Sequence, residues 1–319
     1  MKKISIIIPV YNRERHLEEC VDSILLSIEN DVEIIIVDDG STDRTPEICD
    51  KLKKKSDCIK VIHQTNKGVA NARNTGLSAA SGEWIAWVDS DDLVSASYIR
   101  TLKKCIASID TDIIIFEYAT FTNSNDVSIK MPISNNIREI RKEECYEALG
   151  DISVGNFLWN KLFRRKLFEG ITFPDGKVYE DIATTYRVLD KAKKIILLTS
   201  KIYFYRQHSD SIVHRTNGTK ALKMLQNRVE AHNELVKFLK GKYPAAFEIQ
   251  NKLLIKLAFE YIKAEETLKI SPTPTYIQCR DFIRGYKISI KRDGIKLCAK
   301  VIICNNAFPI YKLIFRLHG

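Results

Sequence analysis

Three carboxylates that directly follow a short apolar run carry the clearest chemical signal in this chain. Residues 84–88 are apolar, and Asp89, Asp91 and Asp92 come immediately after them. Anions a few Å apart repel one another by roughly 4 kcal/mol at intermediate dielectric, and a divalent cation turns that repulsion into coordination. Hard oxygen ligands suit Mg²⁺ or Mn²⁺. The pattern predicts half of a metal site completed by a phosphorylated ligand; alternatively, Asp92 caps a helix over residues 93–104.

Alternating strand and helix patterns predict the sheet that positions these carboxylates. Strands are expected at residues 4–10, 32–37, 59–63, 84–88 and 113–117, with helices at 17–25, 45–55 and 69–78. Such alternation is typical of a parallel sheet covered on both faces, and ligands of these sheets bind at the carboxyl ends of the strands. We therefore expect the site at that edge.

Two other strand ends should bring polar groups to the same edge. Pro9 and Tyr11 mark the end of the first strand, and Asp38 and Asp39 mark the end of the second. No glycine fingerprint follows the first strand, which counts against dinucleotide-binding and P-loop enzymes. Instead, Tyr11 offers a ring for stacking and Asp39 an acceptor for a base N–H. These residues suit a nucleotide, although Asp38 and Asp39 could also cap the next helix.

Four further charged residues could contact phosphate or an acceptor hydroxyl. Lys67 precedes a predicted helix and Arg73 lies within it, where a cation can pair with phosphate or with a surface carboxylate. Glu180 and Asp181 are adjacent carboxylates. One of them could act as a general base, a role worth roughly 10²–10⁴ in rate. Alternatively, the pair only favours the start of a helix at residues 182–189.

A later aromatic segment adds a second group of candidates. Residues 203–212, expected to follow a strand at 194–199, contain Arg206 and His208. A loop with these groups can close over a diphosphate or line a sugar pocket, while His208 could equally be a surface histidine. Trp159 is either a core residue or a platform for a sugar ring.

Charge divides the chain into two parts. Residues 220–319 hold 19 Lys and Arg against 8 Asp and Glu, a net charge of +11, whereas residues 1–219 have a net charge of −1. No zinc spacing, RNA-binding motif or helix-turn-helix accompanies the basic region, so nucleic acid is not expected as a partner. The eight cysteines form no CxxC pair, which favours reduced thiols in the cytosol. The N-terminus shows no signal-peptide pattern, and no run reaches membrane-spanning length.

Together these motifs resemble the family 2 glycosyltransferases, nucleotide-sugar-dependent enzymes of the GT-A fold. The resemblance covers most of residues 1–215 through ordered blocks at 6–12, 37–43, 66–76, 88–92, 159–162, 179–181 and 205–208. The later blocks look like the acceptor half of bacterial members that build capsular, exopolysaccharide or wall polymers. The implied architecture is α/β, with a mainly parallel sheet. A catalytic domain would span 1–219 (nucleotide-binding half 1–118, acceptor half 119–219), followed by a basic helical region at 220–319.

The resemblance also implies roles for individual residues. Those implied for nucleotide-sugar binding are Pro9, Tyr11, Asp39, Asn66, Gly68, Arg73, Asp89, Ser90 and Arg206. Those implied for holding Mn²⁺ or Mg²⁺ are Asp89, Asp91, Asp92 and His208. Asp181, assisted by Glu180, would deprotonate the acceptor for a single displacement that inverts the anomeric carbon.

The expected partners follow from this family and from the basic region. They are a UDP-sugar donor and a glycan or lipid-linked acceptor, with a hexose or N-acetylhexosamine transferred. Residues 288–317 mix lysines with apolar residues, which favours peripheral contact with an anionic membrane on its cytoplasmic face. A dimerisation module is the alternative for this region. The alternative for the whole chain is a non-catalytic nucleotide-sugar or glycan-binding module that recruits an assembly.

Overall fold

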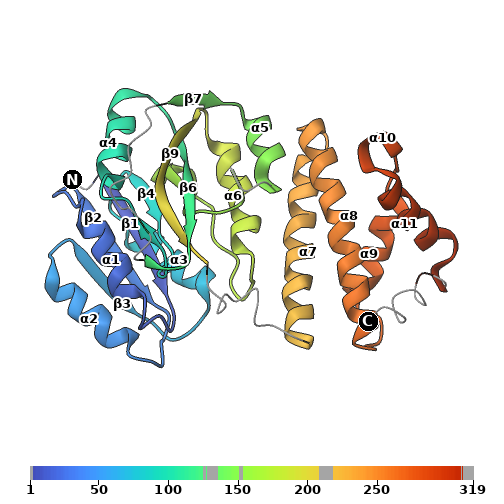
Figure 1. Ribbon diagram of the computed structural model, residues 1–319, viewed down its shortest axis with the longest axis horizontal. Coiled ribbons are helices and arrows are strands. Elements are labelled where there is room, and N and C mark those ends of the chain that lie inside the picture. The colour runs from blue at the N-terminus through green and yellow to red at the C-terminus, as the bar shows by residue number, and fades with distance from the viewer. Residues whose placement is uncertain are drawn as a thin grey trace. The chain divides into compact units, whose positions relative to one another are not determined.

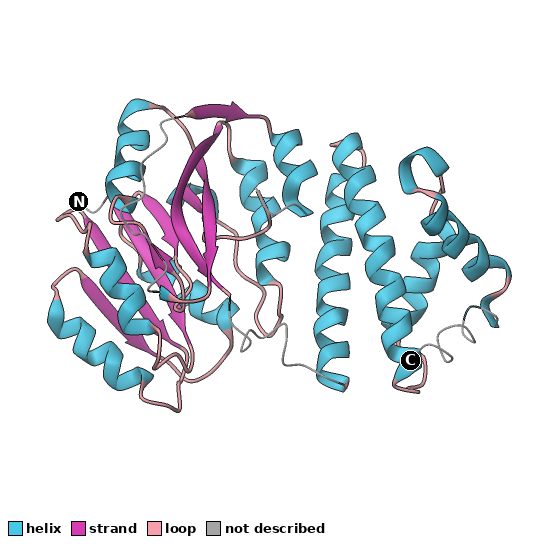
Figure 2. Ribbon diagram, in the orientation of Figure 1, coloured by secondary structure: helices cyan, strands magenta, loops and turns pink. Residues whose placement is uncertain are grey.

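A nine-stranded sheet lies in the first of two units in the chain. The computed structural model describes residues 3–124, 127, 136–150, 154–207, 218–309 and 311. The chain divides into Met1–Ser211 and Ile212–Gly319. The elements are labelled in Figure 1, and Figure 2 shows that all strands belong to the first unit whereas the second is helical.

The N-terminal strands form where their β-branched runs predict them. β1 (Ile4–Val10) pairs in parallel with β2 (Val32–Asp38) and with β4 (Trp84–Trp87), and β2 pairs in parallel with β3 (Ile59–His63). Every residue of β1 and β2 is buried, as expected for parallel strands covered on both faces. The helices that connect them are α1 (Leu17–Leu25), α2 (Thr45–Lys55) and α3 (Val69–Ala79).

The rest of the sheet is mixed. The strand order is β3-β2-β1-β4-β8-β6-β9-β5, with β7 pairing with β9. β8, β5 and β7 run antiparallel to their neighbours, and the other strands share one direction. The later strands are β5 (Leu93–Val94), β6 (Ile113–Phe121), β7 (Ile137–Ile140), β8 (Lys161–Arg164) and β9 (Ile195–Arg206), and the later helices are α4 (Tyr98–Ser108), α5 (Lys142–Glu147) and α6 (Glu180–Lys191).

Alternate residues of β1 face different helices. Ile6 and Ile8 share a core cluster with Cys20 of α1 and with side chains of α2 and α4. Ile7 points to the opposite face, where α3 packs so closely that a Cβ on Gly76 would lie 2.4 Å from the Ile7 side chain. Glycine at position 76 therefore brings α3, and the arginine it carries, against the sheet.

The second unit has its own helical core. α7 (Thr219–Leu239) packs on α8 (Pro244–Thr267), which contacts α9 (Pro274–Gly285); α10 (Ile290–Asp293) and α11 (Ile295–Asn306) follow. The cluster includes Leu254, Tyr261, Ile283 and Val301. Within the described part of the chain, none of the helices is both long and apolar enough to cross a membrane.

Two sequence-based expectations about local structure are wrong. Residues 93–104 do not form one helix capped by Asp92: Leu93–Val94 is strand β5, which pairs with β9, and α4 begins at Tyr98. Residues 203–206 do not follow a strand, because they belong to β9, which pairs with β6 as far as Arg206 opposite Phe121. Pairing with distant strands, which local patterns do not encode, explains both differences.

A buried carboxylate holds together the edge of the sheet opposite the polar strand ends. Glu33 in β2 is 1% exposed, and its Oε1 accepts hydrogen bonds from the Ser5 hydroxyl (2.6 Å) and from the Ser81 N–H (2.7 Å) and hydroxyl (2.6 Å). Its Oε2 lies 2.7 Å from the Lys60 Nζ. Burial raises the pKa of Glu33, but these partners outweigh burial and lower it to about 2.

We expect Glu33→Gln to destabilise the fold by roughly 2 kcal/mol at neutral pH, because the carboxylate is bound more strongly than an amide. The folded-state pKa lies below the unfolded value of about 4.3, so this stabilisation is complete above the unfolded pKa and is lost as pH falls toward about 2. Urea denaturation of both proteins between pH 7 and pH 3 measures the difference. The surface variant Glu47→Gln is the control; a wild-type advantage that does not shrink at low pH would contradict the assignment.

Candidate active site

The three carboxylates after β4 have different environments. Asp92 is fully buried; its Oδ2 accepts a hydrogen bond from the Tyr203 hydroxyl (2.6 Å) and its Oδ1 accepts one from the Arg206 backbone N–H (2.7 Å). The side chains of Asp89 and Asp91 are 33% and 18% exposed. Asp92 therefore anchors the turn to β9, whereas Asp89 and Asp91 remain accessible to a ligand.

Strand β9 supports this acidic turn through two side chains. The Tyr203 hydroxyl accepts a hydrogen bond from the Asp89 N–H (3.1 Å) while donating to Asp92. Arg206 donates from Nε to the Asp91 carbonyl (2.6 Å) and from Nη2 to Glu19 Oε2 (2.7 Å). Arg206 thus positions the turn from within a strand. His208, the other residue expected here, lies outside the described residues.

Two arginines neutralise part of the acidic cluster. Arg13 Nε lies 3.2 Å from Asp91 Oδ2, and Arg73 Nη2 lies 3.6 Å from Asp89 Oδ1. Arg73 also forms an ion pair through Nη1 with Glu180, at the start of α6. Arg73 and Glu180 are both buried, so the alternative of a pair with a surface carboxylate is wrong. Arg73 connects the acidic turn with the second pair of carboxylates.

The carboxylates still carry more negative charge than these arginines offset. Burial raises the pKa of Asp89 to about 6; Arg73 opposes the shift, and Asp91 and Asp181 add to it. Burial also raises the pKa of Asp92, with further contributions from Asp89 and Asp91. A bound cation would relieve this repulsion.

The donor set fits a magnesium or manganese ion that shares its coordination with a ligand. Asp89 and Asp91 offer hard carboxylate oxygens, and Mg²⁺ commonly binds one or two carboxylates together with substrate phosphates and water. Across the residues that the structure describes, no group of three or more His, Cys, Asp or Glu side chains could hold a metal ion. The ligand would therefore have to supply the remaining oxygens.

A clamp between α3 and the segment before α6 brings Glu180 and Asp181 to this edge. Asn74, next to Arg73, donates from Nδ2 to the Phe173 carbonyl and accepts from the Phe173 N–H, both at 2.9 Å. The Phe173 ring packs edge-on against Trp87 of β4 at 5.4 Å.

Burial raises the pKa of Asp181, against the opposing effects of Arg73 and the Ile182 N–H.

Two of the residues expected to bind the nucleotide, Asn66 and Gly68, lie in a turn that is bound to Asp39. Its buried carboxylate accepts hydrogen bonds from the Lys67 N–H (2.9 Å), the Gly68 N–H (2.7 Å) and Gln64 Nε2 (2.7 Å). These contacts bring the 66–68 turn, including exposed Asn66, to the end of β2. The expected residues are therefore close in space, although donors from the chain already engage Asp39.

The other candidates differ in accessibility. Tyr11 is exposed, whereas Pro9 is buried within β1 and Ser90 is buried in the acidic turn. Trp159 is a core residue, stacked on Phe157 at 4.9 Å and on Tyr203 at 4.7 Å between ring centroids.

Asp38 and Asp39 do not cap the next helix, so that alternative is wrong. Asp38 binds the Ser41 N–H (3.0 Å) and His63 Nδ1 (2.8 Å), while α2 begins only at Thr45. The pKa of His63 is raised mainly by its hydrogen bond with Asp38. Burial acts in the opposite direction and lowers this pKa.

Several residues of the site could not be predicted from the sequence. Arg13 directly follows the Tyr11-Asn12 motif. Its position next to a predicted nucleotide contact is a local signal that could have identified it as a phosphate ligand. The roles of Tyr203 and Glu19 have no such signal, since Tyr203 binds the acidic turn, and Glu19 binds Arg206, from elements far away in the chain.

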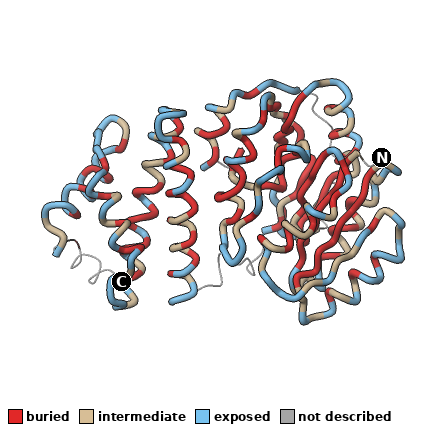
Figure 3. The backbone as a smooth tube through the Cα atoms, turned by 180° about the vertical axis from the view of Figure 1, so that it is seen from behind, coloured by how far each residue is buried: buried red, intermediate tan, exposed pale blue. Residues whose placement is uncertain are grey.

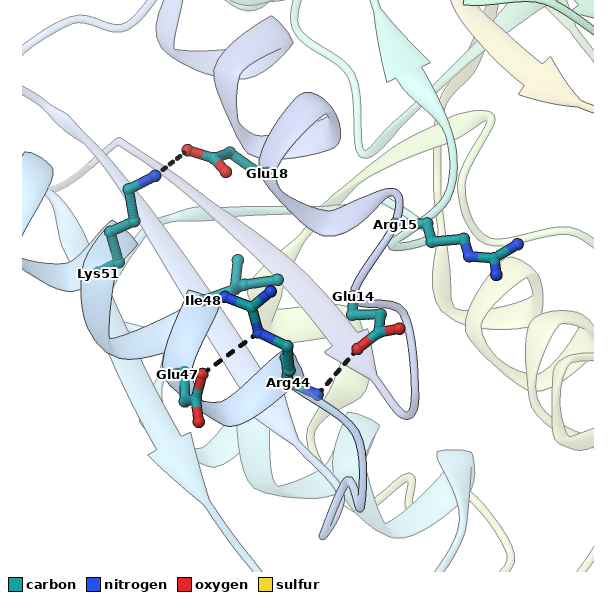
Figure 4. Close-up of a pocket in the computed structure, with 7 residues that line it drawn as sticks. All are labelled: Glu14, Arg15, Glu18, Arg44, Glu47, Ile48 and Lys51. Atoms are coloured by element: carbon teal, nitrogen blue, oxygen red, sulfur yellow. Dashed lines mark hydrogen bonds and ion pairs between the residues drawn. The ribbon is translucent and has the colours of Figure 1, made fainter.

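The pocket in Figure 4 is separate from this chemistry. It is lined by Glu14, Arg15, Glu18, Arg44, Glu47, Ile48 and Lys51 of α1, α2 and the segments before them. Its charged groups pair with one another: Lys51 Nζ lies 2.8 Å from Glu18, and Arg44 Nε lies 3.5 Å from Glu47. None of the acidic-turn residues lines it.

Asp89 and Asp91 follow β4 at the carboxyl end of the parallel strands, the edge at which α/β sheets bind ligands, and Arg73 connects Asp89 with Glu180 of α6. Residues 5–172 match the family described as Glycosyl transferase family 2, which is more than half of the chain. The chain belongs to this family, and the resemblance inferred from the sequence is confirmed.

A named relative is Glycosyltransferase GlyG of Streptococcus pneumoniae serotype 4. It is 36% identical over 219 residues, covering 66% of this chain and 72% of the relative. The match covers a smaller share of two other curated relatives. The chain spans 63% of the length of one of them and 31% of the length of the other.

Solved structures confirm the expected GT-A fold. The structure of S. aureus TarS 1-349 in complex with UDP-GlcNAc has a TM-score of 0.68 and 21% identity, covering 94% of this chain and 86% of that chain. The mannosyltransferase PcManGT of Pyrobaculum calidifontis, in complex with GDP-Man and Mn²⁺, has a TM-score of 0.57 and 17% identity, covering 98% of this chain and 84% of that chain.

We expect Tyr203→Phe to destabilise the protein by about 1–3 kcal/mol, because it leaves the buried Asp92 Oδ2 and the Asp89 N–H without the hydroxyl that joins them. Urea denaturation measures the loss. Tyr205→Phe is the matched control, since Tyr205 stacks on the same Trp159 ring at 5.4 Å. Equal losses in the two variants would show that the Tyr203 hydroxyl has no special role.

Proposed function

We propose that this protein is an inverting, metal-dependent glycosyltransferase that moves a hexose or N-acetylhexosamine from a UDP-sugar to a glycan or lipid-linked acceptor in bacterial surface polysaccharide synthesis. One observation carries the proposal. The accessible Asp89 and the buried Glu180 pair with the same buried arginine, Arg73, and the charges of Asp91 and Asp181 both act on Asp89. A leaving diphosphate and an attacking hydroxyl need these two groups of carboxylates next to each other.

On the donor side, the exposed Tyr11 ring would stack on the base, and the Asp39 turn would border it. The UDP-GlcNAc complex of TarS supports a UDP-sugar as donor. Arg13 and Arg73 would contribute positive charge beside the diphosphate, as expected for phosphate recognition by guanidinium groups.

Asp89 and Asp91 would hold Mn²⁺ or Mg²⁺ against the diphosphate, and the Mn²⁺ complex of the mannosyltransferase supports a divalent ion. When bound, the ion offsets the charge on the departing UDP. Asp92 would bind no metal, because both of its oxygens are engaged by β9. Its role is to keep the other two carboxylates in place.

Asp181 would be the general base that deprotonates the acceptor, assisted by the adjacent Glu180. Glu180 is paired with Arg73, so we assign the role of base to its neighbour Asp181. Burial raises the pKa of Asp181, which makes it a stronger base. One base and no covalent intermediate correspond to a single displacement, and therefore to inversion.

We expect Asp91→Asn to lower UDP release roughly a hundredfold or more, because it removes a ligand of the ion that stabilises the leaving group. EDTA should abolish turnover of the wild type, and excess Mn²⁺ should restore it. Thermal unfolding confirms that the variant is folded, and the exposed Asp57→Asn serves as the control. Full activity of the wild type in EDTA would eliminate the metal from the mechanism.

We expect Asp181→Asn to lower kcat roughly 10²–10⁴-fold while UDP affinity in the presence of Mn²⁺ is unchanged, since the amide cannot accept the acceptor proton. In the wild type, the raised pKa of Asp181 places the acid limb of the kcat/KM profile above the ordinary aspartate value of about 3.9, with activity falling as pH falls. Calorimetry and a transfer assay separate binding from chemistry. Retained transfer would assign the base elsewhere, and UDP binding without any transfer in the wild type would favour a recruiting module.

A further inference from the structure

Helices α10 and α11 of the second unit present isoleucines to solvent. Ile290 is 68% exposed, Ile295 is 74% exposed and Ile302 is 48% exposed. Single exposed apolar residues are ordinary, but a group of them on one short stretch indicates an interaction surface. Figure 3 shows that exposed positions dominate this C-terminal part of the chain.

The periodicity of α11 separates two apolar faces. Ile295 and Ile302 are seven positions apart, and Ala299 lies between them, so all three share the solvent side of the helix. On the other side, Val301 and Cys304 are buried in the core of the second unit. One apolar face of α11 therefore packs against the fold, and a second one is uncovered.

The exposed charges that residues 287–306 themselves carry have one sign, and the exposed Glu248 of α8 lies 3.7 Å from Arg292. Lys287, Lys291, Lys296 and Lys300 are all exposed. Asp293 is the one acidic residue between positions 287 and 306. It is buried, and its carboxylate accepts hydrogen bonds from the Tyr286 hydroxyl (2.7 Å), the Ser289 N–H (2.9 Å) and Arg292. Hydrogen bonding to Arg292 is the main cause that holds the pKa of Asp293 well below its usual range.

We propose that this surface, the α10–α11 face, docks on an anionic lipid bilayer. An amphipathic helix lying in the interface buries its isoleucines among acyl chains while lysines extend to the headgroups. Anionic headgroups are the partner that matches four exposed lysines on a segment whose one acid, Asp293, is buried. A second copy of the chain fits less well, because a two-fold contact would place the same lysines against one another.

The proposal does not depend on the donor, the metal or the base. It concerns a surface of the second unit, and none of its residues belongs to the candidate active site. Bilayer binding and sugar transfer can therefore be measured, and can fail, separately.

Vesicle flotation of the full chain tests the proposal. The probe is a set of vesicles of phosphatidylglycerol and phosphatidylcholine in equal parts, with phosphatidylcholine alone as the neutral comparison. We expect binding to the mixed vesicles to be at least roughly tenfold tighter than to neutral ones, and to weaken as salt is added. Equal binding to both vesicles, or binding to neither, would overturn the proposal.

Two paired variants separate the apolar and ionic contributions. The double variant Ile295→Ser with Ile302→Ser should weaken vesicle binding roughly tenfold or more, because it removes inserted apolar surface. Lys296→Glu with Lys300→Glu should do the same and should lower the salt dependence. Ile277→Ser on α9 and Lys237→Glu on α7, both at exposed positions, are the matched controls.

Unchanged melting temperature and unchanged UDP release identify the paired variants as folded. If they bind vesicles as the wild type does, the α10–α11 face is not the docking surface. If the isoleucine pair instead converts a dimer into a monomer in analytical ultracentrifugation and leaves vesicle binding intact, the face is an interface between copies and the proposal is wrong.

Discussion

The buried carboxylate of Asp92 is the constraint on which the rest of the candidate site depends. Its two oxygens bind Tyr203 and Arg206, which are 111 and 114 residues away in the sequence. The chain leaves the acidic turn directly into β5, which pairs with the same part of β9. Asp89 and Asp91 therefore sit on a turn fixed at both ends. This preorganisation lets their oxygens be presented to a ligand without a loop first having to order.

Charge balance explains why the neighbouring elements meet where they do. The buried guanidinium of Arg73 pairs with Asp89 and Glu180 and also acts on the charge of Asp181. Such a group is stable only if cations or hydrogen bonds offset the cost of burial. The divalent cation proposed for this site would add positive charge next to Asp89 and Asp91.

The sequence was sufficient where structure is encoded locally. β1, α2 and β3 have the predicted bounds, because β-branched runs and helical spacing are local signals. The sequence did not predict strand β8 (Lys161–Arg164), since a short apolar run fits a strand or a helix equally well until its antiparallel partners are known. The same limit applied to the site: the motifs identified its carboxylates, but only contacts with β9 distinguish buried Asp92 from accessible Asp89 and Asp91.

Arg73 and Asn74 are consecutive residues, and this adjacency has an evolutionary consequence. Arg73 pairs with Asp89 and with Glu180. Asn74, the next residue of α3, forms hydrogen bonds with the backbone of Phe173, which precedes α6. The distance between the acidic turn and the start of α6 is thus set by two consecutive residues of α3. It is not set by the length of chain that joins these two segments. Intervening segments could be exchanged or lengthened while the reacting groups keep their separation, so a lineage of such proteins could acquire new acceptors without rebuilding its chemistry.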